Sequence, residues 1–79
     1  NINNISYQIY PNPIQKLNNL IIQSENQITN INIYNLLGEK MCQSNNTNRI
    51  FIKNIAKGTY IIDINFYNNI SVKEKIIIE

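Results

Sequence analysis

Hydrophobic and polar residues alternate in several short stretches of the chain, as they do in strands that bury one face in a core. The longest clear stretch begins at residue 59. One of its faces carries Tyr60, Ile62, Ile64 and Phe66, and the other carries Thr59, Ile61, Asp63 and Asn65. The pattern predicts a strand with an apolar inner face, and it places Asp63 on the outer face as a solvated charge.

Six other stretches alternate over shorter lengths, and we predict a strand in each: residues 5–10, 19–23, 29–34, 39–43, 49–53 and 71–78. The side chains expected to face the core are Leu20, Ile22, Ile31, Ile33, Met41, Ile50, Ile52, Val72, Ile76 and Ile78. Most of these residues are isoleucine, whose β-branched side chain suits a pleated, half-buried surface.

Turn-forming residues separate the predicted strands. Pro11-Asn12-Pro13 ends the first strand because proline cannot donate to a ladder, and Asn12 is expected to bond its own backbone at that corner. Gly38 and Gly58 supply backbone conformations that a Cβ would penalise, and Asn68-Asn69 suits a hairpin turn. The remaining connections are a polar loop at residues 44–48 and a short crossing at residues 54–57.

Seven short strands with no convincing helical stretch predict an all-β fold, a seven-stranded antiparallel immunoglobulin-like β-sandwich. Two sheets packed face to face bury the apolar faces that a single sheet would leave in water. The 79 residues suffice for one domain. A domain this small buries only about 60% of its unfolded surface, so we expect modest stability.

Charge and hydropathy exclude two classes of partner. The net charge is only +2 and the basic residues form no cluster, which is not the footprint of a nucleic-acid binder. No apolar run approaches the roughly 18 residues that span a bilayer. The chain does not begin with Met, so we expect Asn1 to be an internal cut. Residues 1–8 would then hold the end of an upstream linker and the start of the first strand, and residues 9–79 the domain.

The sequence offers little chemistry for catalysis. It has no histidine, so Cys42 has no neighbouring base of that kind and is expected to be a small half-buried side chain. The carboxylates are scattered: Glu25, Glu39, Asp63, Glu74 and Glu79. No zinc-like cluster, acidic calcium loop or glycine-rich phosphate loop occurs. We therefore expect a non-catalytic domain with no metal, cofactor or small-molecule substrate.

Two features leave alternatives open. The five tyrosines could form a platform for sugars, although a structural role is favoured. Lys73 and Lys75 alternate on the last predicted strand, where they either prevent aggregation through a sheet edge or belong to a docking surface for a partner.

Four segments, taken in order, carry a resemblance to a known family: Ile9–Pro13, Ile31–Met41, Ile55–Ile62 and Lys73–Ile78. The first resembles the Tyr-Pro-Asn-Pro opening of the type A C-terminal sorting domain of the type IX secretion (Por secretion) system. The others resemble its glycine-turn hairpin, its Leu-x-x-Gly-x-Tyr strand start and its basic-then-aliphatic last strand. The chain departs from the family pattern at Asn35, often Asp, at Ile55, often Leu, and at Glu79, where a basic residue is usual.

The resemblance implies a sorting signal that directs a cargo across the outer membrane to the cell surface or the medium and is then removed. The implied partners are the outer-membrane translocon, its shuttle protein and a sortase-like signal peptidase that cuts near the linker before Tyr10. The residues implied in recognition or in the recognised shape are Tyr10, Pro11, Asn12, Pro13, Gly38, Gly58, Tyr60, Lys73 and Lys75. Tyr60 would form a tyrosine corner.

An immunoglobulin-like or fibronectin-like binding module of a secreted protein remains the alternative. It predicts an exposed aromatic platform and a position inside the parent chain. The sorting signal predicts that Glu79 is the end of the parent chain.

Overall fold

The computed structural model describes residues 5–79, and these form seven strands and no helix. In chain order the strands are β1 (Tyr7–Tyr10), β2 (Asn19–Ser24), β3 (Ile28–Tyr34), β4 (Lys40–Asn45), β5 (Arg49–Phe51), β6 (Gly58–Phe66) and β7 (Ser71–Ile78). All pairings between neighbouring strands are antiparallel. The prediction of an all-β, seven-stranded fold is confirmed, and the proposed linker at residues 1–4 lies outside the described residues.

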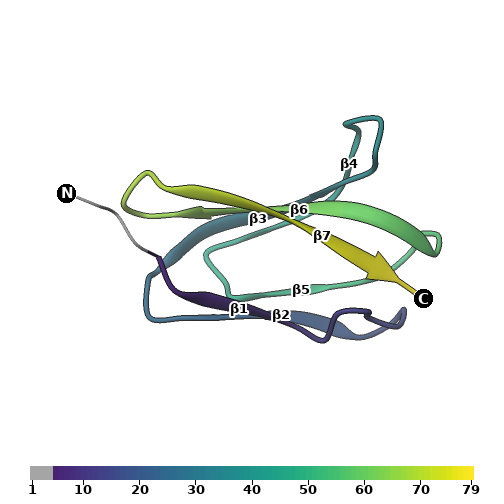
Figure 1. Cartoon of the computed structure of the whole chain (residues 1–79), viewed down its shortest axis with the longest axis horizontal. Coiled ribbons are helices and arrows are strands. Elements are labelled where there is room, and N and C mark those ends of the chain that lie inside the picture. The colour runs from purple at the N-terminus through teal and green to yellow at the C-terminus, as the bar shows by residue number, and fades with distance from the viewer. Residues whose placement is uncertain (1–4) are drawn as a thin grey trace.

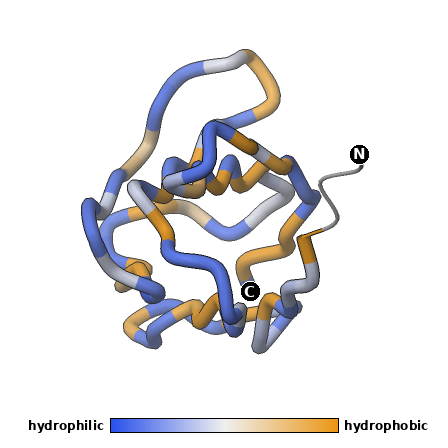
Figure 2. The backbone as a smooth tube through the Cα atoms, turned by 90° about the vertical axis from the view of Figure 1, so that its left-hand side faces the viewer, coloured by the Kyte–Doolittle hydropathy of each residue, from blue (hydrophilic) through white to orange (hydrophobic). Residues whose placement is uncertain are grey.

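The strands form two layers (Figure 1). One sheet has the order β1-β2-β5 and the other the order β4-β3-β6-β7, so the sheets face each other as an open sandwich. Figure 2 views the layers end-on and shows hydrophobic and hydrophilic stretches alternating along the chain. In β2 the buried residues Leu20 and Ile22 alternate with more exposed ones, which is the predicted period of two.

Isoleucine dominates the core between the layers. The buried hydrophobic residues are Ile14, Leu20, Ile22, Ile28, Ile31, Ile33, Ile50, Ile52, Ile55, Tyr60, Ile62, Ile64, Phe66, Ile76 and Ile78. Ile5, Tyr7, Ile9, Cys42, Ile70 and Val72 pack against this core from its edges. The predicted inward residues are confirmed except for Met41.

Met41 is 39% exposed, so its predicted inward position is wrong. The register shifts between Ile33 and Tyr34: Ile33 pairs with Cys42, whereas Tyr34 pairs with Lys40. Met41 is thus the extra residue of a β-bulge, and a bulge reverses the alternation along one strand. Cys42 takes the inward position and packs against the core half-buried, as expected of it. Burial raises the pKa of its thiol.

Asp63 does lie on the outer face of β6, but it is only 8% exposed, so the prediction of a solvated charge is wrong. Its register partners are Asn32 on β3 and Lys73 on β7. Asn32 Nδ2 and Asn65 Nδ2 lie 3.3 and 3.1 Å from Asp63 Oδ2, and Lys73 Nζ lies 3.5 Å from Oδ1. Neighbouring polar side chains therefore cover a carboxylate that the period alone would leave in water.

Candidate recognition surface

The segment after β1 adds a short parallel bridge to the edge of β7. Ile14 pairs with Ile78. The Ile14 amide donates to the Ile77 carbonyl at 2.8 Å, and the Glu79 amide donates to the Ile14 carbonyl at 2.8 Å. Ile14 and Ile78 are 0% and 1% exposed, so these hydrogen bonds place two side chains in the core. Sequence reasoning missed Ile14 because a single buried residue after a proline has no period.

The Asn12 side chain binds the same edge one step earlier. Its Nδ2 donates to the Lys75 carbonyl at 3.2 Å, and its Oδ1 accepts the Ile77 amide at 3.0 Å. The side-chain amide of Asn12 thus makes the two hydrogen bonds to β7 that a backbone peptide group of a neighbouring strand would make. We expected Asn12 to bond its own backbone; instead it bonds residues 63 and 65 positions away.

Tyr7 makes the third contact between the beginning and the end of the domain. Its hydroxyl donates to the Glu74 carboxylate, and its ring lies 6.4 Å from the ring of Phe66. Desolvation first, and then the hydrogen bond and the negative charge of Glu74, raise the pKa of Tyr7 to about 12. We call residues 7–16 and 74–79 together the clasp, because three kinds of contact join them.

In the first motif Ile9 packs against the core, whereas Tyr10 and the two prolines lie on the outside of the clasp. Tyr10 is 44% exposed, and Pro11 and Pro13 are also exposed. The two prolines separate β1 from the bridge at Ile14, so the segment between them leaves the ladder, as predicted.

The start of β6 contains the predicted tyrosine corner. Tyr60 is 7% exposed, and its hydroxyl donates to the Ala56 carbonyl at 2.5 Å. Gly58 has φ +151, a conformation that an L side chain rarely adopts. The glycine and the tyrosine together turn the crossing segment into the strand.

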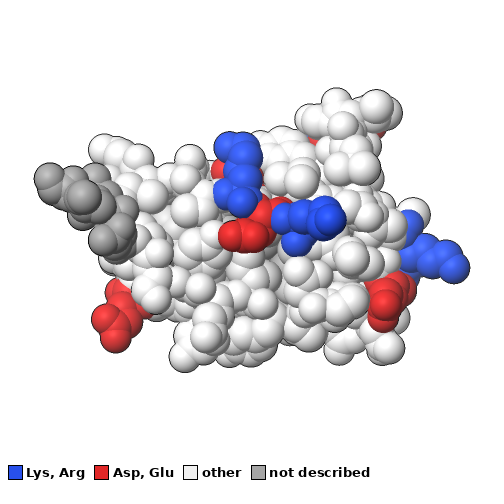
Figure 3. Space-filling view, viewed as in Figure 1, with Lys and Arg blue, Asp and Glu red and all other residues white. Residues whose placement is uncertain are grey.

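Lys73 and Lys75 have different environments although they are two residues apart. The Lys73 ammonium faces Asp63, whereas the side chain of Lys75 is exposed and only its carbonyl takes part in the clasp. In Figure 3 basic and acidic side chains gather over β6 and β7 near the middle of the visible face. Lys73 thus has a structural partner, which neither of its sequence interpretations included.

Gly38 closes the β3–β4 hairpin with φ +88, in the left-handed region that favours glycine, as predicted. Leu36 and Leu37, just before it, are 68% and 86% exposed. The motif residues therefore fall into separate places: the clasp, the corner at Tyr60 and the hairpin loop at Gly38.

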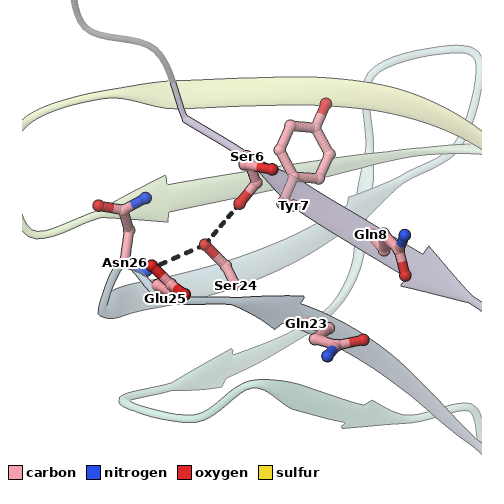
Figure 4. Close-up of a pocket in the computed structure, with 7 residues that line it drawn as sticks. All are labelled: Ser6, Tyr7, Gln8, Gln23, Ser24, Glu25 and Asn26. Atoms are coloured by element: carbon pink, nitrogen blue, oxygen red, sulfur yellow. Dashed lines mark hydrogen bonds between the residues drawn. The ribbon is translucent and has the colours of Figure 1, made fainter.

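A hollow lies where β1 begins and β2 ends (Figure 4). It is lined by hydroxyl and amide groups and one carboxylate, from Ser6, Tyr7, Gln8, Gln23, Ser24, Glu25 and Asn26. Ser24 Oγ donates to the Ser6 carbonyl at 2.9 Å and accepts the Asn26 amide at 3.0 Å. These bonds join the segment before β1 to the end of β2 and the turn that follows it. Among residues 5–79 no three His, Cys, Asp or Glu side chains group as metal ligands would.

The exposed aromatic rings are Tyr10, Phe51 and Tyr67. Register puts Tyr10 opposite Ile21 and Phe51 opposite Asn19, so both rings share the outer face of the three-stranded sheet, with β2 between them. The Tyr67 hydroxyl instead donates to Asn46 Oδ1 in the neighbouring loop. The exposed rings of this face are therefore two, on separate strands with β2 between them.

The fold and the clasp define a small β-sandwich module whose first and last segments are bound together. Residues 8–79 match the family model of the secretion system C-terminal sorting domain, and the chain belongs to this family. Domains of this family are sorting signals for type IX secretion, so the chain marks a protein for the cell surface or the medium and interacts with that machinery. The family is not a catalytic one.

A search of curated proteins finds no match. Within residues 5–79 the structure contains no helix of the length and apolarity needed to cross a membrane.

Proposed function

We propose that the secretion machinery recognises this domain as a folded shape, and that the clasp is the part that makes the shape. The observation that supports this is the binding of Asn12 to the backbone of β7. It joins the opening motif to the last strand, which are far apart in sequence. A short linear peptide could not present both, so recognition would depend on the folded domain.

The partners in this proposal are the outer-membrane translocon and its shuttle protein. They would contact the exposed side of the clasp, formed by Tyr10, Pro11, Pro13 and the side chain of Lys75. These side chains are accessible, whereas those of Ile14 and Ile78 are buried. The buried residues would hold the surface in place, and the exposed ones would touch the partner.

A sortase-like peptidase would then remove the domain on the N-terminal side of Tyr7. Tyr7 is already part of the clasp through Glu74, so a cut after it would detach part of the folded domain. A cut before it leaves the clasp whole. The cargo would be released or attached to the cell surface, and the domain itself would perform no chemistry.

A transport assay tests this proposal. Residues 1–79 are fused behind an exported reporter in a host with a type IX system, and in the same host with the translocon disabled. We expect reporter at the surface or in the medium only in the intact host, with the domain removed. Retention in the periplasm of both strains would contradict the proposal and favour the accessory binding module.

Two variants extend the assay to the clasp. Asn12→Ala should reduce secretion because it releases the edge of β7. Asn68→Ala, an exposed asparagine in the β6–β7 turn, is the matched control and should leave secretion unchanged. Unfolding curves of both purified variants separate loss of recognition from loss of fold. Equal secretion of the Asn12 variant and the control would show that the clasp is not needed.

A further inference from the structure

The loop between β3 and β4 carries Leu37, the most exposed large hydrophobic side chain of residues 5–79, and next to it the exposed Leu36. Leu36 is 68% exposed and Leu37 is 86% exposed. Figure 1 shows this hairpin projecting away from the two layers at the end labelled β4. Met41, displaced outward by the bulge, is on the returning strand of the same hairpin. We call residues 35–39 the hairpin tip.

The hairpin tip is held in shape by the Asn35 side chain. Its Oδ1 accepts the amides of Leu37 and Glu39, each at 2.9 Å, and its Nδ2 donates to Glu39 Oε1 at 2.7 Å. Two backbone bonds close the same turn: Asn35 amide to Glu39 carbonyl at 2.9 Å, and Gly38 amide to Asn35 carbonyl at 3.0 Å. The side chains of Leu36 and Leu37 are exposed and lie outside the core, so they add little packing to the turn.

The two leucines are therefore not needed to build the tip that exposes them. A polar pair could occupy the same turn, because the bonds come from backbone groups and Asn35. An exposed leucine side chain on an ordered turn is unfavourably hydrated in the free domain. Covering that side chain with a partner removes it from water and is therefore favourable. Ordering the turn beforehand also lowers the entropy lost on binding.

We propose that the hairpin tip inserts Leu36 and Leu37 into an apolar pocket with a basic rim on a protein of the secretion machinery. This inference rests on the sorting function. A projecting tip fits a concave pocket, and the buried pair would be the anchor of the contact. Glu39 is in the same turn, two residues after Leu37, and its carboxylate bonds the neutral Asn35 amide, so its negative charge favours a positive rim. The Lys40 ammonium does not neutralise it there, because it bonds Gln43 Oε1 at 3.0 Å, further along β4.

Two other occupants fit the tip less well. An anionic lipid surface would repel Glu39, whereas loops that bind such surfaces carry basic residues. A second copy of the domain offers polar hollows: the one in Figure 4, and its neighbour bounded by residues 24–28 and 46–48, are lined mostly by hydroxyl, amide and carboxylate groups. A protein pocket remains the occupant that matches both the leucines and the charge.

The test compares two sets of leucine substitutions in the reporter fusion described above. Leu36→Ser with Leu37→Ser removes the proposed anchor. Leu17→Ser is the matched control, because Leu17 is 68% exposed like Leu36 and lies away from the tip. We expect the double variant to lower the secreted fraction by about tenfold or more, which corresponds to about 1.4 kcal/mol of lost binding. The control should be secreted like the unsubstituted domain.

Two further measurements identify the occupant. A photo-crosslinking side chain at position 37, but not at position 17, should join the domain to an envelope protein in secreting cells. Glu39→Lys should weaken secretion and Glu39→Gln should weaken it less, because only the first brings a positive charge against the basic rim. Thermal unfolding of the leucine variants should match that of the unsubstituted domain, since the tip does not contribute to the core. Glu39→Lys should be only slightly less stable, because it loses the single exposed hydrogen bond from Asn35.

The outcomes separate this inference from the function on which it rests. Secretion of the double variant at the level of the Leu17 control would overturn the hairpin-tip inference and leave the sorting function intact. Failure of the unsubstituted domain to be secreted would overturn both. Binding of the purified domain to vesicles of anionic phospholipid, lost in the double variant, would replace the protein pocket with a lipid surface.

Discussion

An asparagine side chain contributes hydrogen bonds to both the clasp and the hairpin tip, but the two asparagines bond groups at different distances along the chain. Asn12 bonds backbone groups 63 and 65 residues away, whereas Asn35 bonds groups two and four residues away. The first closes the sandwich. The second shapes a loop that the rest of the domain does not need.

Because of this difference, we expect that substitutions in the hairpin tip can change recognition without changing stability, whereas substitutions in the clasp change both. A change in the clasp affects the whole fold, because its bonds hold Ile14 in the core. A change in the hairpin tip affects the tip alone. In a chain of this size the total free energy of unfolding is about 4–12 kcal/mol, so a loss of a few kcal/mol at the clasp is a large part of it.

The largest expected effect is that of Ile14→Ala. Removing a fully buried isoleucine costs about 2–5 kcal/mol, through lost burial and the cavity that remains. Urea unfolding followed by circular dichroism measures this. Ile77→Ala is the control, because Ile77 is 40% exposed on the outer face of β7 and should cost much less. Equal midpoints for the two variants would show that the bridge at Ile14 does not support the fold.

Asn12→Ala should have the next largest effect. It removes two hydrogen bonds to β7, each worth about 0.5–1.5 kcal/mol in net stability. Asn12→Asp keeps the acceptor for the Ile77 amide and loses the donor to the Lys75 carbonyl, so it should fall between Asn12→Ala and the unsubstituted domain. Amide exchange at Ile77 gives a local reading: faster exchange is expected in the alanine variant, and unchanged exchange would contradict the contact.

Tyr7→Phe should cost about 1 kcal/mol at neutral pH, because it removes the hydrogen bond to Glu74. The pKa of Tyr7 is about 12 in the folded domain and 10.0 without such surroundings. The stabilisation is therefore complete below pH 10 and is lost as the pH rises from 10 to about 12. The gap in unfolding free energy between the two proteins should narrow over that interval. A constant gap would mean that Tyr7 titrates alike in both states.

The smallest effect is expected for Asn35→Ala. The turn loses three side-chain hydrogen bonds at an exposed site, and we expect about 0.5 kcal/mol of stability to be lost, since water replaces them. Exchange of the Leu37 and Glu39 amides should nevertheless accelerate. A loss of stability as large as that of Asn12→Ala would remove the distinction between the two asparagines.

The alternation of residues predicted the strands and most of the core, because each strand has one face toward the other sheet. It failed where the pattern is broken locally. The bulge at Met41 reversed the inward positions of β4, and nothing in the residues 39–43 marks a bulge. Asp63 was assigned to solvent because the residues paired with it, Asn32 and Lys73, belong to other strands. The sequence of one strand does not show which residues of the neighbouring strands lie opposite it.

The recognition surface was predictable in its parts and not in its assembly. The motif residues Asn12, Gly58 and Tyr60 were singled out as shape-forming, and Asn12 and Tyr60 make side-chain bonds to the backbone. Their partners were not singled out, because Asn12 and Tyr7 bond residues at the far end of the chain. The exposure of Leu36 and Leu37 was also missed, since two adjacent leucines beside a glycine are compatible with a buried turn.

The clasp also determines when, during export, the domain can finish folding. Its two halves are residues 7–16 and 74–79, so a chain leaving an export channel with its N-terminal end first cannot form it until residue 79 has emerged. Contacts of such long sequence separation form late in folding. A chain still in transit, or one broken before Ile78, would lack the finished surface. The finished surface would therefore form only after the whole segment from residue 7 to residue 79 has left the channel.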